Sequence, residues 1–160
     1  MILSIIVLAA LATLSGLTVI TTQGTMSQAT NDRFHTIALR AAESGAASAM
    51  DFLRANVDQP GGPGSKWTHW LTHQPNFAAN GALPDTANNQ FRHDQQAYYT
   101  VDILNNRTDP GYLAGNDTDL DVIIHSVGHG PNGTIAIIEW EVSITGAGQP
   151  MTLVGWREVL

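Results

Sequence analysis

The first twenty residues, Met1 to Ile20, read MILSIIVLAALATLSGLTVI and contain no charged side chain. The first charged residue of the chain is Asp32. Twenty residues of α-helix rise about 30 Å, which is the thickness of the hydrocarbon core of a bilayer. The stretch therefore predicts an apolar helix long enough to span a membrane, with every charged group of the chain placed after it.

The composition of the whole chain limits the classes of function. The chain has 160 residues, a formal net charge of -7 and no cysteine. Its 14 acidic and 7 basic residues argue against nucleic acid as a main partner, because phosphate binding needs clustered Lys and Arg. The lack of cysteine excludes disulfides, thiolate metal sites and covalently attached haem, and we expect no cofactor.

Three interpretations of the apolar N-terminal stretch remain open. A cleaved signal peptide needs a basic region before its apolar core, and no Lys or Arg precedes the core here. A membrane anchor fits the length, although positively charged flanks are missing on both sides. The third interpretation is a mature chain whose basic leader has been removed, which accounts for an apolar stretch that starts at the first residue.

Helical spacing continues from Met26 to about Val57, and the section AAESGAASAM (Ala41 to Met50) is rich in small residues. Small residues on a helix face allow a sheet or another helix to approach closely. Between Gly16 and Gly24 the β-branched residues have low helix propensity, so any break of the helix within the first 57 residues is expected there. The residues expected on the buried stripe are Phe34, Ile37, Ala41, Gly45, Ser48 and Phe52.

The last third of the chain changes from helical to alternating periodicity, after a loop region predicted for residues 58–95. Short turns separate the later segments, as in hairpins. The pattern predicts an α+β fold: a long N-terminal helix whose second half (residues 26–57) packs on a four-stranded antiparallel sheet (residues 96–160), with Trp140 buried between them. The domain boundary is expected between an apolar segment, residues 1–25, and a head, residues 26–160. The four predicted strands are Ala97 to Leu104, Leu120 to Val127, Thr134 to Ile144 and Met151 to Leu160.

This order of elements resembles a type IV pilin. The apolar start, followed by TTQGTMSQATNDRFHTIALRAAESGAASAM, is most similar to the PilX-like group of minor pilins. The Ala-Ala-Glu-small-small element of that group is matched by residues 41–45. The segments IIHSVGHGPNGTIAIIEWEV and WREVL also look like the last strands of the group.

The resemblance implies a structural subunit of a type IV pilus-like extracellular filament that polymerises through its apolar helix. Its partners would be copies of itself, other pilins and the inner-membrane assembly machinery, and it would lie in the inner membrane before assembly. Major pilins carry Glu at the fifth mature position, whereas this chain has Ile5. A minor pilin or pseudopilin that initiates or caps a fibre is therefore an alternative, and a non-polymerising single-pass anchored domain is a further one. The residues assigned to assembly are Met1, Ile5, Ala9, Ala10, Ala12, Gly16 and Gly24.

The sequence gives only weak signals for a catalytic site or a metal site. No P-loop and no nucleophile elbow is present, so we expect no enzyme activity. Asp117, Asp119 and Asp121, near Asn116 and Asp109, form an oxygen-rich patch of the kind that binds calcium. The same alternating acids also fit the solvent face of a strand, and we expect no resident metal.

Three segments match the N-glycosylation acceptor pattern, at Asn106, Asn116 and Asn132. All three fall in predicted loops or turns. We therefore expect their side chains to be accessible.

Overall fold

The computed structural model describes residues 2–59, 61–72, 89–92 and 97–159. One helix, α1 (Ile2–Ala55), precedes five strands. The strands are β1 (Asn89–Arg92), β2 (Ala97–Asn105), β3 (Asp121–His129), β4 (Ile135–Ser143) and β5 (Thr152–Val159). Three short 3-10 helices are η1 (Thr68–Trp70), η3 (Tyr112–Ala114) and η4 (Pro131–Gly133). The chain divides into two compact units, Met1–Phe34 and His35–Leu160.

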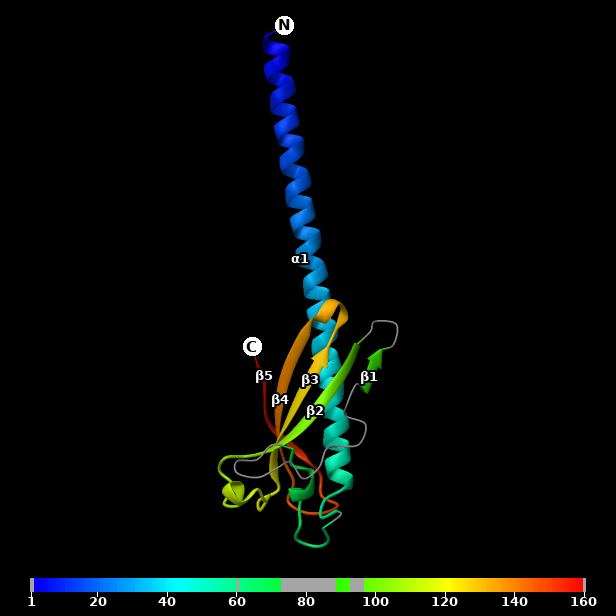
Figure 1. The fold of residues 1–160 in the computed structure, drawn as a ribbon, viewed down its shortest axis with the longest axis vertical. Helices are drawn as coiled ribbons and strands as arrows, with labels where there is room; N and C mark the ends of the chain where they lie inside the picture. The colour runs from blue at the N-terminus through cyan, green and yellow to red at the C-terminus, as the bar shows by residue number, and fades with distance from the viewer. Residues whose placement is uncertain (1, 60, 73–88, 93–96, 160) are drawn as a thin grey trace. The chain divides into compact units, whose positions relative to one another are not determined.

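The sheet of the second unit is antiparallel, with the strand order β1-β2-β3-β4-β5 (Figure 1). The four strands predicted from the alternating pattern are confirmed, and so is the α+β fold. A fifth strand, β1, lies in the region predicted as loop and pairs Asn89 with Tyr99 of β2. Its four residues, NQFR, contain no apolar alternation that could have marked it as a strand.

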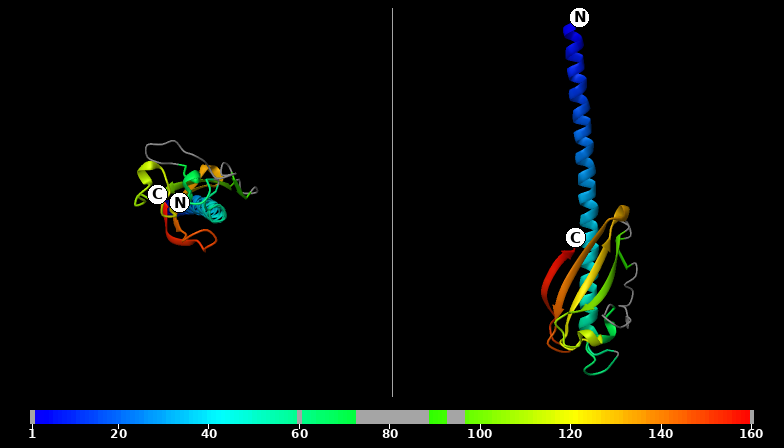
Figure 2. Two further views of the ribbon diagram at one scale, coloured as in Figure 1. Left: turned by 90° about the horizontal axis from the view of Figure 1, so that it is seen from below. Right: turned by 60° about the vertical axis from the view of Figure 1, so that its left-hand side comes forward.

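The second half of α1 lies along one face of this sheet (Figure 2). Burial alternates along β3 from Asp121 to His129, so that every second side chain faces the helix. The same face of the neighbouring strands is buried, as predicted. The core contains Val101, Ile103, Val122, Ile124, Ile138 and Val142.

Trp140 faces the helix as expected, but the expectation that it is buried is wrong, because the side chain is only partly buried against the core. Its cross-strand partner on the edge strand β5 is Trp156, which is 67% exposed. The core therefore ends at Trp140, and the side of the indole toward β5 stays open.

The small residues of α1 allow an unusually close approach to the sheet. A Cβ atom added at Gly128 of β3 would lie 2.0 Å from the Ala38 carbonyl oxygen and 2.5 Å from the Ala42 nitrogen. The Ser126 hydroxyl donates a hydrogen bond of 2.8 Å to the Ala42 carbonyl. Of the two partners that small residues could admit, a sheet or a helix, the sheet occupies this face.

The buried stripe of α1 is rotated from the expected one. Ile37, Ala41 and Gly45 are buried as predicted, but Ser48 is exposed, and Phe34 and Phe52 are only partly buried. The stripe instead follows positions on the neighbouring row of the helix. The residues that fill it are Ala38, Ala42, Ala46, Ala49 and Leu53.

The C-terminal end of α1 is closed by an aromatic side chain. Trp67 is fully buried, and its indole Nε1 donates a hydrogen bond of 2.9 Å to the Leu53 carbonyl. This bond satisfies one of the carbonyl groups that a helix end leaves without an intrahelical partner. Phe52 packs edge-on against Trp70, with 4.9 Å between ring centroids.

Candidate functional site

The first part of α1, up to Ile20, presents a largely apolar surface. Every described residue from Ile2 to Arg33 is exposed. This part of α1 is long and apolar enough to cross a membrane, judged by length and composition. Monomeric soluble proteins rarely expose apolar patches larger than a few hundred Å², so an exposed surface of this kind marks a contact with protein or lipid. The exposed large side chains are Ile2, Leu3, Ile5, Ile6, Val7, Leu8, Leu11, Leu14, Leu17, Val19, Ile20 and Met26.

The threonine hydroxyl groups of this segment, and that of Ser15, are satisfied within the helix. Thr13 donates to the Ala10 carbonyl at 2.8 Å, and Thr22 donates to the Thr18 carbonyl at 2.7 Å. Ser15, Thr18, Thr21 and Thr25 make similar bonds to carbonyls three or four residues earlier. An unpaired hydroxyl in apolar surroundings costs free energy, and these bonds remove that cost. The segment can therefore be buried in lipid or protein despite its Ser and Thr content.

The residues assigned to assembly lie on this surface. Ile5 is 64% exposed, and Ala9, Ala10 and Ala12 are exposed as well. A Cβ atom added at Gly16 or Gly24 would meet no atom within 4 Å beyond the surrounding turns of its own helix, and α1 runs through both residues without a break. Met1 lies outside the described residues. The break expected between Gly16 and Gly24 applies to the helix in a fibre, so it stays a prediction.

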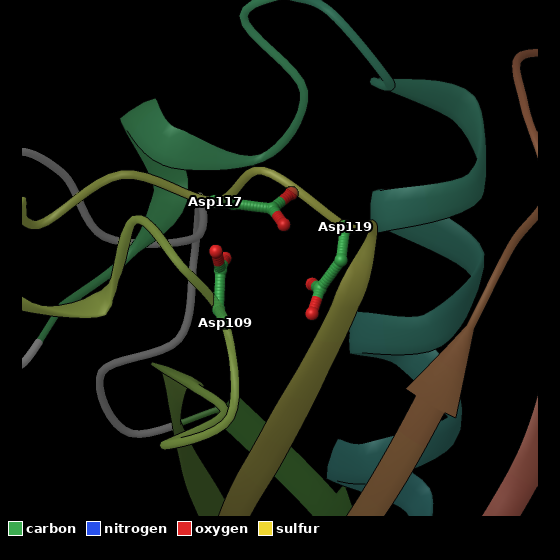
Figure 3. A group of neighbouring side chains, drawn as sticks. All are labelled: Asp109, Asp117 and Asp119. Atoms are coloured by element: carbon green, nitrogen blue, oxygen red, sulfur yellow. The ribbon is translucent and has the colours of Figure 1, made fainter.

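A cluster of carboxylates lies at the end of the sheet near the start of β3 (Figure 3). One oxygen from each of Asp109, Asp117 and Asp119 lies within 4.8 Å of the others. Asp117 and Asp119 thus meet as the sequence suggested, but the third member is Asp109, and Asp121 is not part of the group. The Asp121 amide instead donates to Asp119 at 3.1 Å as β3 begins.

Both oxygens of each clustered carboxylate accept hydrogen bonds from the protein. Asp109 accepts from the Gly111 amide at 2.6 Å, from the Thr118 amide at 2.7 Å and from the Thr118 hydroxyl. Asp117 accepts from the amides of Trp67 and Leu120, both at 2.9 Å. The Asn106 amide group donates to Asp119 at 3.1 Å. These bonds tie the loop before β3 to the segment that carries Trp67, so the cluster has a structural role.

Burial raises the pKa of Asp117 from 3.8 to about 6, and the neighbouring Asp109 and Asp119 add to the shift against the opposing hydrogen bonds from Trp67 and Leu120. A raised pKa means that the folded head holds this proton more tightly than the unfolded chain does. Protonated Asp117 therefore contributes to the free energy of unfolding of the head below about pH 4, and this contribution is lost as the pH rises through 6.

Replacing Asp117 with Asn should therefore reduce the pH dependence of the free energy of unfolding of the head. Between pH 4 and pH 7, the stability of Asp117→Asn relative to the wild type should rise by about 2.5 kcal/mol, which is most of the free-energy equivalent of the pKa shift. Urea unfolding of the full chain in mild detergent, followed by tryptophan fluorescence at both pH values, measures this difference.

Glu139 provides a control of opposite sign. Burial raises its pKa, but hydrogen bonds from Arg157 and His125 outweigh burial and lower the pKa below the usual value. Arg157 Nε donates to Glu139 at 2.6 Å, and His125 Nδ1 lies 3.1 Å from the other carboxylate oxygen. The stability of Glu139→Gln relative to the wild type should fall as the pH rises from 4 to 7. Parallel pH profiles for the wild type and Asp117→Asn would contradict the assignment for Asp117.

The three glycosylation candidates differ in accessibility. Asn116 and Asn132 are exposed, as expected for a turn. Asn106 is buried, because its side chain both donates to Asp119 and accepts the Asp109 amide at 3.0 Å. The expectation that Asn106 is accessible is therefore wrong.

The close approach at Gly128 was missed in the sequence, and Asp109 was placed near the acidic patch but not within it, although each residue carried a signal. Gly128 interrupts an alternating strand, and a glycine inside a strand is typical of a close backbone approach. Asp109 begins an Asp-Pro-Gly turn, and Asp in such turns bonds to backbone groups one or two residues later.

Comparison with known proteins gives no relative for this chain. No family model, no curated protein and no solved structure matches it. The case for a function is therefore made by the residues and their geometry.

Proposed function

We propose that this chain is a structural subunit of a type IV pilus-like extracellular filament, which polymerises through the apolar first part of α1. The observation that carries the proposal is the complete exposure of Ile2 to Arg33, in which the first charged residue is Asp32. A folded head follows, built on the same helix. Because the rest of the chain does not bury this apolar helix, lipid or other chains must bury it.

The same segment can serve in both surroundings. In a membrane, the helix satisfies its own backbone groups, and the hydroxyl bonds described above satisfy its Thr side chains and Ser15. In a fibre, copies of the segment would bundle and bury one another. Ala9, Ala10, Ala12 and Gly16 allow neighbouring helices to approach closely, so that packing replaces contact with lipid.

A minor pilin that starts or caps a fibre is the second candidate, and Ile5 is the residue that favours it. Under the resemblance to pilins, a major subunit would carry Glu at this position. A single-pass anchored domain that never polymerises uses the same apolar segment. The three differ in where the chain is found.

Electron microscopy of fibres sheared from cells, labelled with gold-conjugated antibody against the head, separates the three. A filament-forming subunit predicts gold along the whole length of each fibre. Label confined to one end of each fibre would favour the minor pilin. Label only on membranes, with none on fibres, would contradict the proposal and favour the anchor.

A further inference from the structure

The head has an uncovered apolar strip between α1 and the edge strand β5. The strip encloses a hollow of about 230 Å³ lined by Ile138, Trp140, Leu153, Trp156 and Glu43 of α1. Leu153 and Trp156 are 42% and 67% exposed. Their register partners, Val142 and Trp140, face α1, which places both side chains on the helix side of the sheet. The helix side of the sheet therefore continues onto β5, where no core residue covers it.

Glu43 gives this apolar strip a negative charge. The side chain is exposed on α1, and no ion pair or hydrogen bond joins it to another described residue. The other nearby carboxylate of the helix side, Glu158, already lies 3.1 Å from His35. A partner for the strip thus needs an apolar side chain that fills the hollow and a cation that reaches Glu43.

The loop between β2 and β3 carries both features. Leu113 in η3 is 73% exposed. Among the described residues of the second unit, the other exposed large apolar side chains all belong to β4 and β5. Arg107, on the same loop, is exposed and has no ion pair with a described residue. The carboxylate cluster holds this loop in place through Asp109, so Leu113 and Arg107 are presented by a fixed structure.

We propose that the strip receives the loop of a second copy of this chain, with Leu113 in the hollow and Arg107 paired with Glu43. The strip and the loop are different surfaces of one head, so the contact is heterologous. A heterologous contact that does not close into a ring repeats without limit, as a filament requires. This inference rests on the proposed function, and it names the head surfaces that would join neighbouring subunits.

Charge reversal tests the pairing in filaments formed by the full chain. Glu43→Arg alone and Arg107→Glu alone should each lower the yield of sheared filaments about tenfold or more, and the double variant should restore it. Asp51→Arg, which changes an exposed carboxylate of α1 whose ion pair is with Arg54 of the same helix, is the matched control and should leave the yield unchanged. Failure of the double variant to restore the yield, or restoration by Arg40→Glu in place of Arg107→Glu, would overturn the inference.

Cross-linking separates this inference from the proposed function. The chain has no cysteine, so copies with Leu113→Cys can be co-expressed with differently tagged copies carrying Leu153→Cys. Oxidation should join the two tags, whereas Thr145→Cys, in an exposed turn, should not join to Leu113→Cys. Filaments without this cross-link would overturn the inference alone. The cross-link in membranes without filaments would support the inference and contradict the proposed function.

Discussion

Cells that produce the Ala10→Asp variant should make no filaments, while the head stays folded. Ala10 lies in the middle of the uncharged segment and is exposed, so in a fibre its side chain would be surrounded by other apolar helices. A carboxylate at the centre of a membrane-spanning helix costs about 2.5–3.5 kcal/mol on insertion, and a bundle of apolar helices is a comparable environment. No Lys or Arg precedes Arg33, so the segment offers no cation to pair with the new charge. Counting sheared fibres by electron microscopy measures the effect.

The same substitution elsewhere controls for a general effect of an added charge. Ala147 is exposed in the turn before β5, and Ala147→Asp should form fibres at the level of the wild type. Protease resistance and tryptophan fluorescence should show that both variants keep a folded head. Normal fibres from Ala10→Asp would contradict the role given to the apolar segment.

The variant Gly128→Ala should destabilise the head by about 3 kcal/mol or more, at the upper end of the usual cost of overpacking. The added Cβ would overlap backbone atoms of Ala38 and Ala42, at 2.0 Å and 2.5 Å. Backbone cannot move aside as a flexible side chain can, so α1 would have to separate from β3. Separation would also break the bond from Ser126 to the Ala42 carbonyl. Urea unfolding in detergent measures the loss.

Gly155 is the matched control for this prediction. It also lies within a strand, β5, but a Cβ atom there would meet only Glu141 Oε2, at an ordinary 3.7 Å. Gly155→Ala should therefore change the free energy of unfolding by about 0.5 kcal/mol or less. If Gly128→Ala and Gly155→Ala have equal stability, the close approach of helix and sheet does not contribute as described.

The sheet was predictable because its side chains alternate strictly between core and solvent, as along β3. The rotation of the helix was not, because alanine carries almost no directional signal. Ala46 is buried and its neighbour Ala47 is exposed, although the two residues are chemically identical. The partial exposure of Trp140 depends on where the core ends, which the periodicity of one strand does not encode. The polar strand β1 lacks alternation altogether.

The candidate site was also predictable only in part. The apolar surface of α1 was predictable because the absence of charge is a property of consecutive residues. The carboxylate cluster was only partly predictable, since a turn brings Asp109 to Asp117 while the start of β3 separates Asp121 from them. Asn106 looked like an accessible loop residue, but the loop uses its amide group to bind Asp109 and Asp119.

Helical reconstruction of purified fibres by electron cryomicroscopy tests the central claim most directly. The account predicts fibres in which this chain repeats along the whole length. The uncharged part of α1 would be bundled at the axis, and the sheet would lie outside it. Fibres whose axis contains another chain, or purified chain that stays single in membranes under conditions where fibres assemble, would contradict it.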